Sequence, residues 1–84
     1  MFLHIGADAS VATRDVIAII DVKSLARSPA TREFLSLAES ERRVYRSGEG
    51  GFKSMVVTST AVYLSPITPA TLRRRLRARG FIYE

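Results

Sequence analysis

The sequence lacks cysteine and tryptophan and contains one histidine, His4. Without cysteine no disulfide can form, and a solitary histidine argues against a zinc site. A chain of 84 residues buries only about 60–65% of the surface that its unfolded form exposes, and domains of this size often need a disulfide, a metal or a partner subunit for stability. Self-association is the device that remains, so we predict a homo-oligomer.

Long apolar runs are also missing. No run approaches the roughly 18 residues of a membrane span, and residues 1–6 lack the basic and apolar regions of a signal peptide. The absence of cysteine suits a reducing compartment. We therefore expect a cytoplasmic protein without a membrane segment. Its 46% apolar and 25% charged residues are typical of a folded protein, and the length allows one domain, residues 1–84.

Acidic residues are scarce in the last third of the chain. Residues 1–52 hold seven basic and seven acidic groups, whereas residues 53–84 hold six basic groups and Glu84 alone, which accounts for the net charge of +5. Most of the basic residues are arginine, whose planar guanidinium suits phosphate better than an ammonium does. This asymmetry predicts a polyanionic partner.

No set of residues forms a recognisable catalytic centre. His4 has no partner for a dyad, and three aspartates are better explained as strand-end caps: Asp8, Asp15 and Asp21. The glycine-rich loop at residues 48–51 could form a backbone nest for phosphate, but it lacks the Gly-Lys-Ser/Thr of a P-loop and carries Glu49. We expect no enzyme activity, no small-molecule substrate, no cofactor and no metal.

Apolar patterns predict an α+β domain with a few-stranded, largely antiparallel sheet. The β-branched run at residues 16–20 is too short for a helix and indicates a buried central strand. The remaining predicted strands are residues 2–5 before a turn at 7–10, residues 44–46 at a sheet edge, and a hairpin of 53–58 and 61–64 around Ser59-Thr60.

Two helices begin with the same signal, a cap followed by proline, at Ser28-Pro29 and Thr68-Pro69. The first should fade near residues 41–43 and turn an apolar stripe to the core: Ala30, Phe34, Leu37 and Ala38. The second should end at Gly80 and dock through Leu72 and Leu76.

Five arginines stand within residues 73–79 with no acid among them. At about 100° per residue, Arg73, Arg74 and Arg77 cluster away from the docked leucines, while Arg75 and Arg79 flank them. Because like charges on one helix repel, an anion such as phosphate would relieve the cluster. Two alternatives are compensation of the helix dipole and pairing with acids of a neighbouring subunit, such as Glu33, Glu39 or Glu41.

Other candidates lie around the glycine loop. Its flanks, Arg46 and Lys53, could touch a nucleic-acid backbone. Four aromatic residues could stack on bases, but no RNP-like pattern occurs, so core packing and subunit contact are favoured: Phe52, Tyr63, Phe81 and Tyr83. The apolar tail at residues 81–83 suggests a docked chain end.

Several blocks in series resemble the RemA/RemB family of extracellular matrix regulators, most closely its RemB branch. They are Leu3-His4-Ile5-Gly6, Val16 to Asp21, Ala30 to Leu35, Lys53 to Thr58, Val62 to Ile67 and Thr71-Leu72. The resemblance implies a small domain similar to the LytTR type of DNA-binding domain, ring-like homo-oligomers, and regulation of genes for extracellular matrix and biofilm formation.

In the RemA branch, arginines before the first long strand and in the loop before the hairpin are associated with DNA binding. Arg14 lies near the first position, where Asp15 aligns, and the loop pair falls on Gly50 and Gly51, with Lys53 as the basic residue nearby. We therefore predict a transcriptional regulator that binds double-stranded DNA through Arg14, Arg46, Lys53, Arg73, Arg74 and Arg77. A ring-forming scaffold without direct DNA binding is the alternative, and RNA binding a third interpretation.

Overall fold

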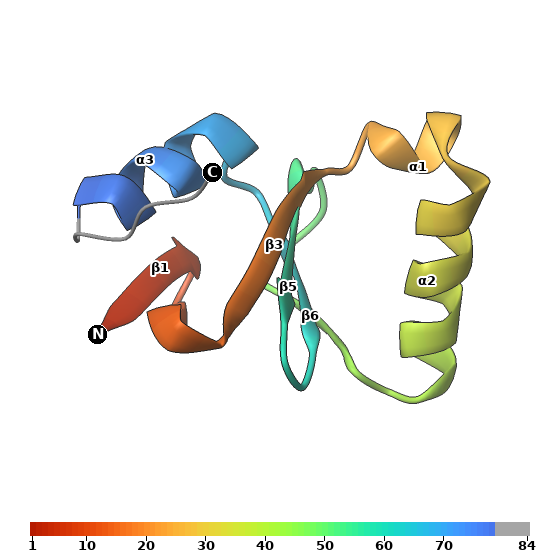
Figure 1. Ribbon diagram of the computed structural model, residues 1–84, viewed down its shortest axis with the longest axis horizontal. Helices are drawn as coiled ribbons and strands as arrows, with labels where there is room; N and C mark the ends of the chain where they lie inside the picture. Colours follow the sequence, from red (N-terminus) through yellow and green to blue (C-terminus); the bar gives the residue numbers. More distant parts are fainter. Residues whose placement is uncertain (79–84) are drawn as a thin grey trace.

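The four-stranded sheet separates two groups of elements in the computed structural model, which describes residues 1–78 (Figure 1). Helix α3 (Pro69–Ala78) and the hairpin of β1 (Phe2–Gly6) and β2 (Ala9–Ala12) lie on one side of the sheet, and helices α1 (Ser24–Arg27) and α2 (Pro29–Ser40) lie on the other. This arrangement confirms the predicted α+β class. Beyond the two predicted helices it adds the single-turn α1 and a 3-10 turn, η1 (Thr13–Asp15).

The sheet runs in the order β3 (Val16–Asp21), β5 (Ser54–Thr58), β6 (Val62–Ser65) and β4 (Val44–Arg46). The β3–β5 and β5–β6 pairs are antiparallel, and β4 pairs in parallel with β6. The predicted hairpin and the predicted edge strand at residues 44–46 are confirmed.

The prediction of a central strand at residues 16–20 is wrong, because β3 lies at the other edge of the sheet. Both of its faces are partly covered, which explains the continuous apolar run. Ile19 packs against the core on the α3 side, and Ile20 packs against the core on the α2 side. A β-bulge leaves Ile17 64% exposed, since Val16 pairs with Thr58 and Ala18 already pairs with Val57.

The core on the α3 side is closed. The hairpin of β1 (Phe2–Gly6) and β2 (Ala9–Ala12) contributes Leu3 and Ile5, and α3 (Pro69–Ala78) contributes Leu72 and Leu76. All four side chains are fully buried, as predicted for the two leucines. Ala9 and Ser10, predicted as part of a turn, belong to β2, so the turn is limited to Ala7-Asp8.

The start signals of both long helices are confirmed. Ser28 Oγ accepts the Thr31 N–H at 3.2 Å at the start of α2 (Pro29–Ser40), and Thr68 Oγ1 accepts the Thr71 N–H at 3.3 Å at the start of α3. The predicted end of α3 at Gly80, Arg79 and the apolar tail at 81–83 lie outside the described residues.

The prediction of a core-facing stripe on α2 is confirmed at Ala38 and wrong at Ala30, Phe34 and Leu37. Its sheet-facing side carries Leu35 and Ala38, whereas Phe34 is 43% and Leu37 62% exposed and Ala30 is exposed as well. Helix α1 (Ser24–Arg27) leads into α2, and no residue of either helix is fully buried. The α2 side of the sheet is therefore only partly covered.

A polar contact ties β1 to the far strands of the sheet. Ser65 Oγ donates to the Ile5 carbonyl at 2.6 Å, and Ser47 Oγ donates to the Gly6 carbonyl at 2.7 Å. Ser47 is buried and begins the predicted glycine loop. The loop has no regular secondary structure. No helix within residues 1–78 has the length and apolar character of a membrane span.

Candidate nucleic-acid interface

Helix α3 presents four exposed arginines: Arg73, Arg74, Arg75 and Arg77. Since Leu72 and Leu76 point into the core, the other faces of the helix are left to the arginines. The surface position that the helical wheel predicted is confirmed. These positions lie on the side of the sheet away from α2 (Figure 1).

Two of the arginines reach back to the body of the domain. Arg73 Nη2 donates to the Ile19 carbonyl of β3 at 2.7 Å, and Arg75 Nη1 donates to the His4 carbonyl of β1 at 3.3 Å. The helical wheel predicts that Arg75 flanks the buried leucines and that Arg73 points away from them. In the structure both Arg73 and Arg75 flank the leucines. The arginines that point outward are therefore Arg74 and Arg77.

None of these guanidinium groups is neutralised by a carboxylate within residues 1–78, where the one ion pair is Arg43–Glu41 at 3.7 Å. Glu33 and Glu39, two of the acids named as partners in a neighbouring subunit, are exposed on α2 and lie across the sheet from α3 of the same copy. The positive charge of α3 is therefore uncompensated by ion pairs in the described part of the chain.

Lys53 and Arg73 come together at a cleft beside the start of α3. The cleft has a volume of about 530 Å³ and is lined by Asp21, Val22, Lys23, Phe52, Lys53, Thr68, Pro69, Ala70 and Arg73. Lys23 is a basic residue that the sequence reasoning missed. An Asp-x-Lys sequence at the end of a strand predicts a tight turn, since an aspartate side chain can accept a backbone N–H two residues later. Here Asp21 Oδ1 accepts the Lys23 N–H at 2.9 Å.

Arg46 and Arg14 lie apart from this cleft. Arg46 ends β4, on the opposite edge of the sheet from β3 but at the same end as Lys53. Arg14 lies in η1, before the first residue of β3, and Lys53 lies beside the last, a separation of about 20 Å at 3.3 Å per strand residue. The six predicted residues therefore do not form one patch.

The glycine loop has room for side chains. A Cβ at Gly50 or Gly51 would meet no atom within 4 Å, although their φ angles of +42° and +63° lie in the left-handed region. The two positions that align with family arginines are thus open to solvent and sterically able to carry larger residues.

Other sequence candidates have ordinary structural roles. His4 Nε2 lies 2.9 Å from the Ala7 carbonyl, and residues 1–78 contain no group of side chains that could hold a metal ion. Tyr63 stacks on Tyr45 with ring centroids 5.4 Å apart, and Phe52 packs against the core on the α2 side.

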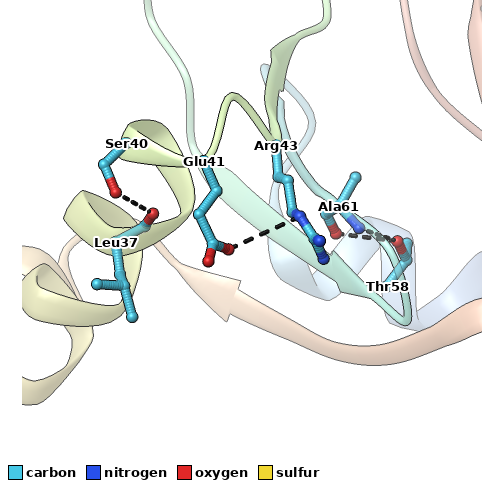
Figure 2. Close-up of polar contacts among 6 residues, drawn as sticks. All are labelled: Leu37, Ser40, Glu41, Arg43, Thr58 and Ala61. Carbon is cyan, nitrogen blue, oxygen red and sulfur yellow. Dashed lines mark hydrogen bonds and ion pairs between the residues drawn. The ribbon is translucent and has the colours of Figure 1, made fainter.

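An apolar groove of about 240 Å³ separates the C-terminal half of α2 from the β5–β6 hairpin. Ile17, Phe34 and Leu37 lie along it, together with Val57 and Ala61. Figure 2 shows its polar rim, where Glu41 reaches across to Arg43 and the Arg43 side chain lies beside Thr58 and Ala61. A groove of exposed aliphatic and aromatic side chains is typical of a protein contact surface.

Comparison with known proteins identifies a family model and a curated relative. A family model described as RemA-like, extracellular matrix regulatory protein A-like, matches residues 2–76. The chain is also 38% identical over 84 residues to extracellular matrix regulatory protein B of Bacillus subtilis (strain 168), an alignment that covers all of this chain and 96% of that protein.

Proposed function

The chain belongs to the RemA-like family of extracellular matrix regulatory proteins, and from this membership we propose that it is a DNA-binding transcriptional regulator of matrix and biofilm genes. In this proposal it acts in the cytoplasm as a homo-oligomer, and arginine–phosphate contacts supply most of the affinity for double-stranded DNA. No catalytic step is part of it.

The observation that carries the proposal is the uncompensated positive charge of α3. Arg74 and Arg77 are exposed, and no carboxylate within residues 1–78 pairs with them. Guanidinium groups bind phosphate oxygens through charge-assisted, often bidentate hydrogen bonds. Lys53 and Arg73 at the nearby cleft extend the same positive surface.

A homo-oligomer would multiply contacts that are weak in a single copy, because linked sites bind with a high effective concentration. Two apolar patches support a head-to-tail contact between copies. One is the groove beside α2, and the other is Met1 and Phe2, which are exposed at the opposite end of the molecule (Figure 1). A contact between unlike surfaces closes into a ring when the rotation per copy allows it.

Titration of duplex DNA at several salt concentrations tests DNA binding. With about 3–5 phosphate contacts per engaged subunit, the logarithm of affinity should fall steeply with the logarithm of salt, at about 0.9 per contact. The double variant Arg74→Gln/Arg77→Gln should lower both affinity and slope. Arg42→Gln, an exposed residue at the far end of α2, is the matched control. A flat salt response would remove the electrostatic basis of the proposal.

A gain-of-function variant sharpens the test. Gly51→Arg places a guanidinium at a position open to solvent, and Arg42 shows that arginine already adopts the required backbone, with φ of 59° against 63° at Gly51. One added phosphate contact should steepen the salt dependence by about 0.9. Gly51→Gln, which adds bulk without charge, should leave the slope unchanged.

Light scattering at working salt tests the oligomer. The wild type should elute as an assembly of several subunits, and Leu37→Asp should shift it toward a monomer, because the substitution puts a charge into the apolar groove. Ser36→Asp adds the same charge to a neighbouring exposed position of α2 outside the groove and is the control. A monomeric wild type would contradict the proposed assembly.

The apolar groove also favours a second candidate, a scaffold or protein-interaction module without direct DNA binding. Gly50 and Gly51 in place of the loop arginines fit this alternative. Pull-down from nuclease-treated extract separates the two candidates, since a protein partner of the groove survives nuclease and a DNA-mediated contact does not. Loss of the captured partner with Leu37→Asp would support the scaffold.

A further inference from the structure

The cleft beside the start of α3 has the dimensions of a small-molecule site. Its volume of about 530 Å³ lies within the range of roughly 300–1,000 Å³ that is usual for ligand pockets. Three separate segments form it: the turn after β3, the residues before β5, and the first turns of α3. Figure 1 shows the N-terminal end of α3 beside the end of β3 where the chain leaves for α1.

The charges around this cleft are mainly positive. Lys23, Lys53 and Arg73 line it against a single acid, Asp21. One oxygen of that carboxylate, Oδ1, already accepts the Lys23 backbone N–H, and none of the three cations forms an ion pair within residues 1–78. The cleft therefore carries an excess of two positive charges that a bound anion would balance.

The basic side chains extend from fixed backbone. The Lys53 N–H donates to the Ser65 carbonyl at 2.8 Å, and the Lys53 carbonyl accepts the Val22 N–H at 3.1 Å. Arg73 is held by its bond to the Ile19 carbonyl, which uses one nitrogen of a guanidinium that has five N–H donors in all. Such preorganisation lowers the entropic cost of binding a ligand.

Phe52 gives the cleft an apolar wall next to the cations. It is half-buried and packs against the core, so its position is fixed. An inorganic phosphate would contact the basic groups and leave this wall uncovered. A ligand with a flat apolar part and a charged phosphate part would use both.

From these features we propose that the cleft binds a small phosphate-bearing organic anion of the nucleotide type, with its phosphates at Lys23, Lys53 and Arg73 and its flat part against Phe52. Lys53 and Arg73 also belong to the proposed DNA surface, so the ligand competes with DNA for them. This competition rests on the proposed function, whereas binding of the anion does not.

Isothermal titration calorimetry of the DNA-free protein with ADP, GDP and UDP tests the site. At least one nucleotide should bind, inorganic phosphate and adenosine should each bind more weakly, and Lys23→Gln and Lys53→Gln should each weaken binding about tenfold, as expected for one charge-assisted hydrogen bond. Arg42→Gln, remote from the cleft, should bind like the wild type. Circular dichroism checks that each variant is folded.

Amide chemical shifts locate the ligand. Addition of the bound nucleotide should move the signals of residues 21–23, 52–53 and 70–73 and leave those of the β5–β6 turn unchanged. Absence of binding by all three nucleotides, or shifts confined to other residues, would overturn the site. Equal affinity for inorganic phosphate would overturn the role of Phe52.

Displacement of fluorescent duplex DNA by the same nucleotide tests the competition. The nucleotide should release DNA from the wild type and have a weaker effect on Lys23→Gln. If the protein binds no DNA, the calorimetry still decides the cleft. If DNA binds but no nucleotide does, this inference fails and the proposed function stands.

Discussion

The two sides of the four-stranded sheet differ in how completely they are covered. On the α3 side, Leu3, Ile5, Leu72 and Leu76 are fully buried, whereas on the α2 side the helix has no fully buried residue and leaves Phe34 and Leu37 exposed. The closed side contains most of the fully buried apolar side chains and carries the arginines of α3. The open side leaves apolar side chains exposed. Most of the buried core is thus assigned to one side of the sheet and the exposed apolar surface of α2 to the other.

Replacement of core leucines tests this comparison most strongly. Leu72→Ala should destabilise the domain by about 2–5 kcal/mol, because it leaves a cavity in the closed core. Leu37→Ala, the same change on the exposed side, should cost less than about 0.5 kcal/mol. Urea unfolding at one fixed protein concentration measures both, because any self-association would make the apparent stability depend on concentration. Equal losses would contradict the assignment.

A methyl group at Gly6 should cost about 2 kcal/mol or more. Its φ is +122°, and a Cβ there would lie 2.8 Å from both Pro66 Cδ and Ser47 Oγ, inside the contact that ties β1 to the sheet. Gly51→Ala is the matched control, because its Cβ would meet nothing and its φ of +63° is tolerated by other residues. Thermal unfolding of the two variants should therefore separate clearly.

Removal of the Ser65 hydroxyl should cost about 1–3 kcal/mol, the usual loss when buried polar groups lose a partner. Ser65 Oγ donates to the Ile5 carbonyl and accepts the Ile67 N–H at 3.0 Å. Ser40→Ala removes a hydroxyl that bonds the Leu37 carbonyl on the exposed α2 surface and should change stability by less than about 0.5 kcal/mol. A larger loss for Ser40→Ala in urea unfolding would reverse the comparison.

The smallest expected effect is a gain on the α2 side. Arg42 follows the end of α2 with φ of 59°, and the bonds from the Arg43 N–H to the Ala38 carbonyl and from the Arg42 N–H to the Glu39 carbonyl form a Schellman motif. Glycine is the favoured residue at this position, so Arg42→Gly should raise the free energy of unfolding by about 0.5–1 kcal/mol. Arg42→Ala, which keeps the Cβ, should give no such gain.

The elements that the sequence predicted well are those with local signals. Ser28-Pro29 and Thr68-Pro69 mark helix starts through the cap and proline chemistry of four residues. The two strand-like runs on either side of Ser59-Thr60 likewise predict a hairpin. Leu72 and Leu76 were predicted as docked because the arginines leave only one apolar side on α3.

The errors concern non-local contacts. The β-branched run of β3 reads the same for a central strand as for an edge strand covered on both faces. On α2, two apolar stripes share Ala38, one with Phe34 and Leu37 and the other with Leu35, and only the placement of the sheet selects the second. Lys23 was missed because the cations that share its cleft, Lys53 and Arg73, come from distant parts of the chain.

The edge position of β3 has a consequence for the state of the protein in solution. The unpaired backbone N–H and C=O groups of an edge strand can form hydrogen bonds with a strand of another chain. Such pairing is a common first step of aggregation. The guanidinium of Arg73 occupies one such group, the carbonyl of Ile19, and brings a positive charge to that edge. Both the occupied carbonyl and the positive charge disfavour pairing of a further strand at this position.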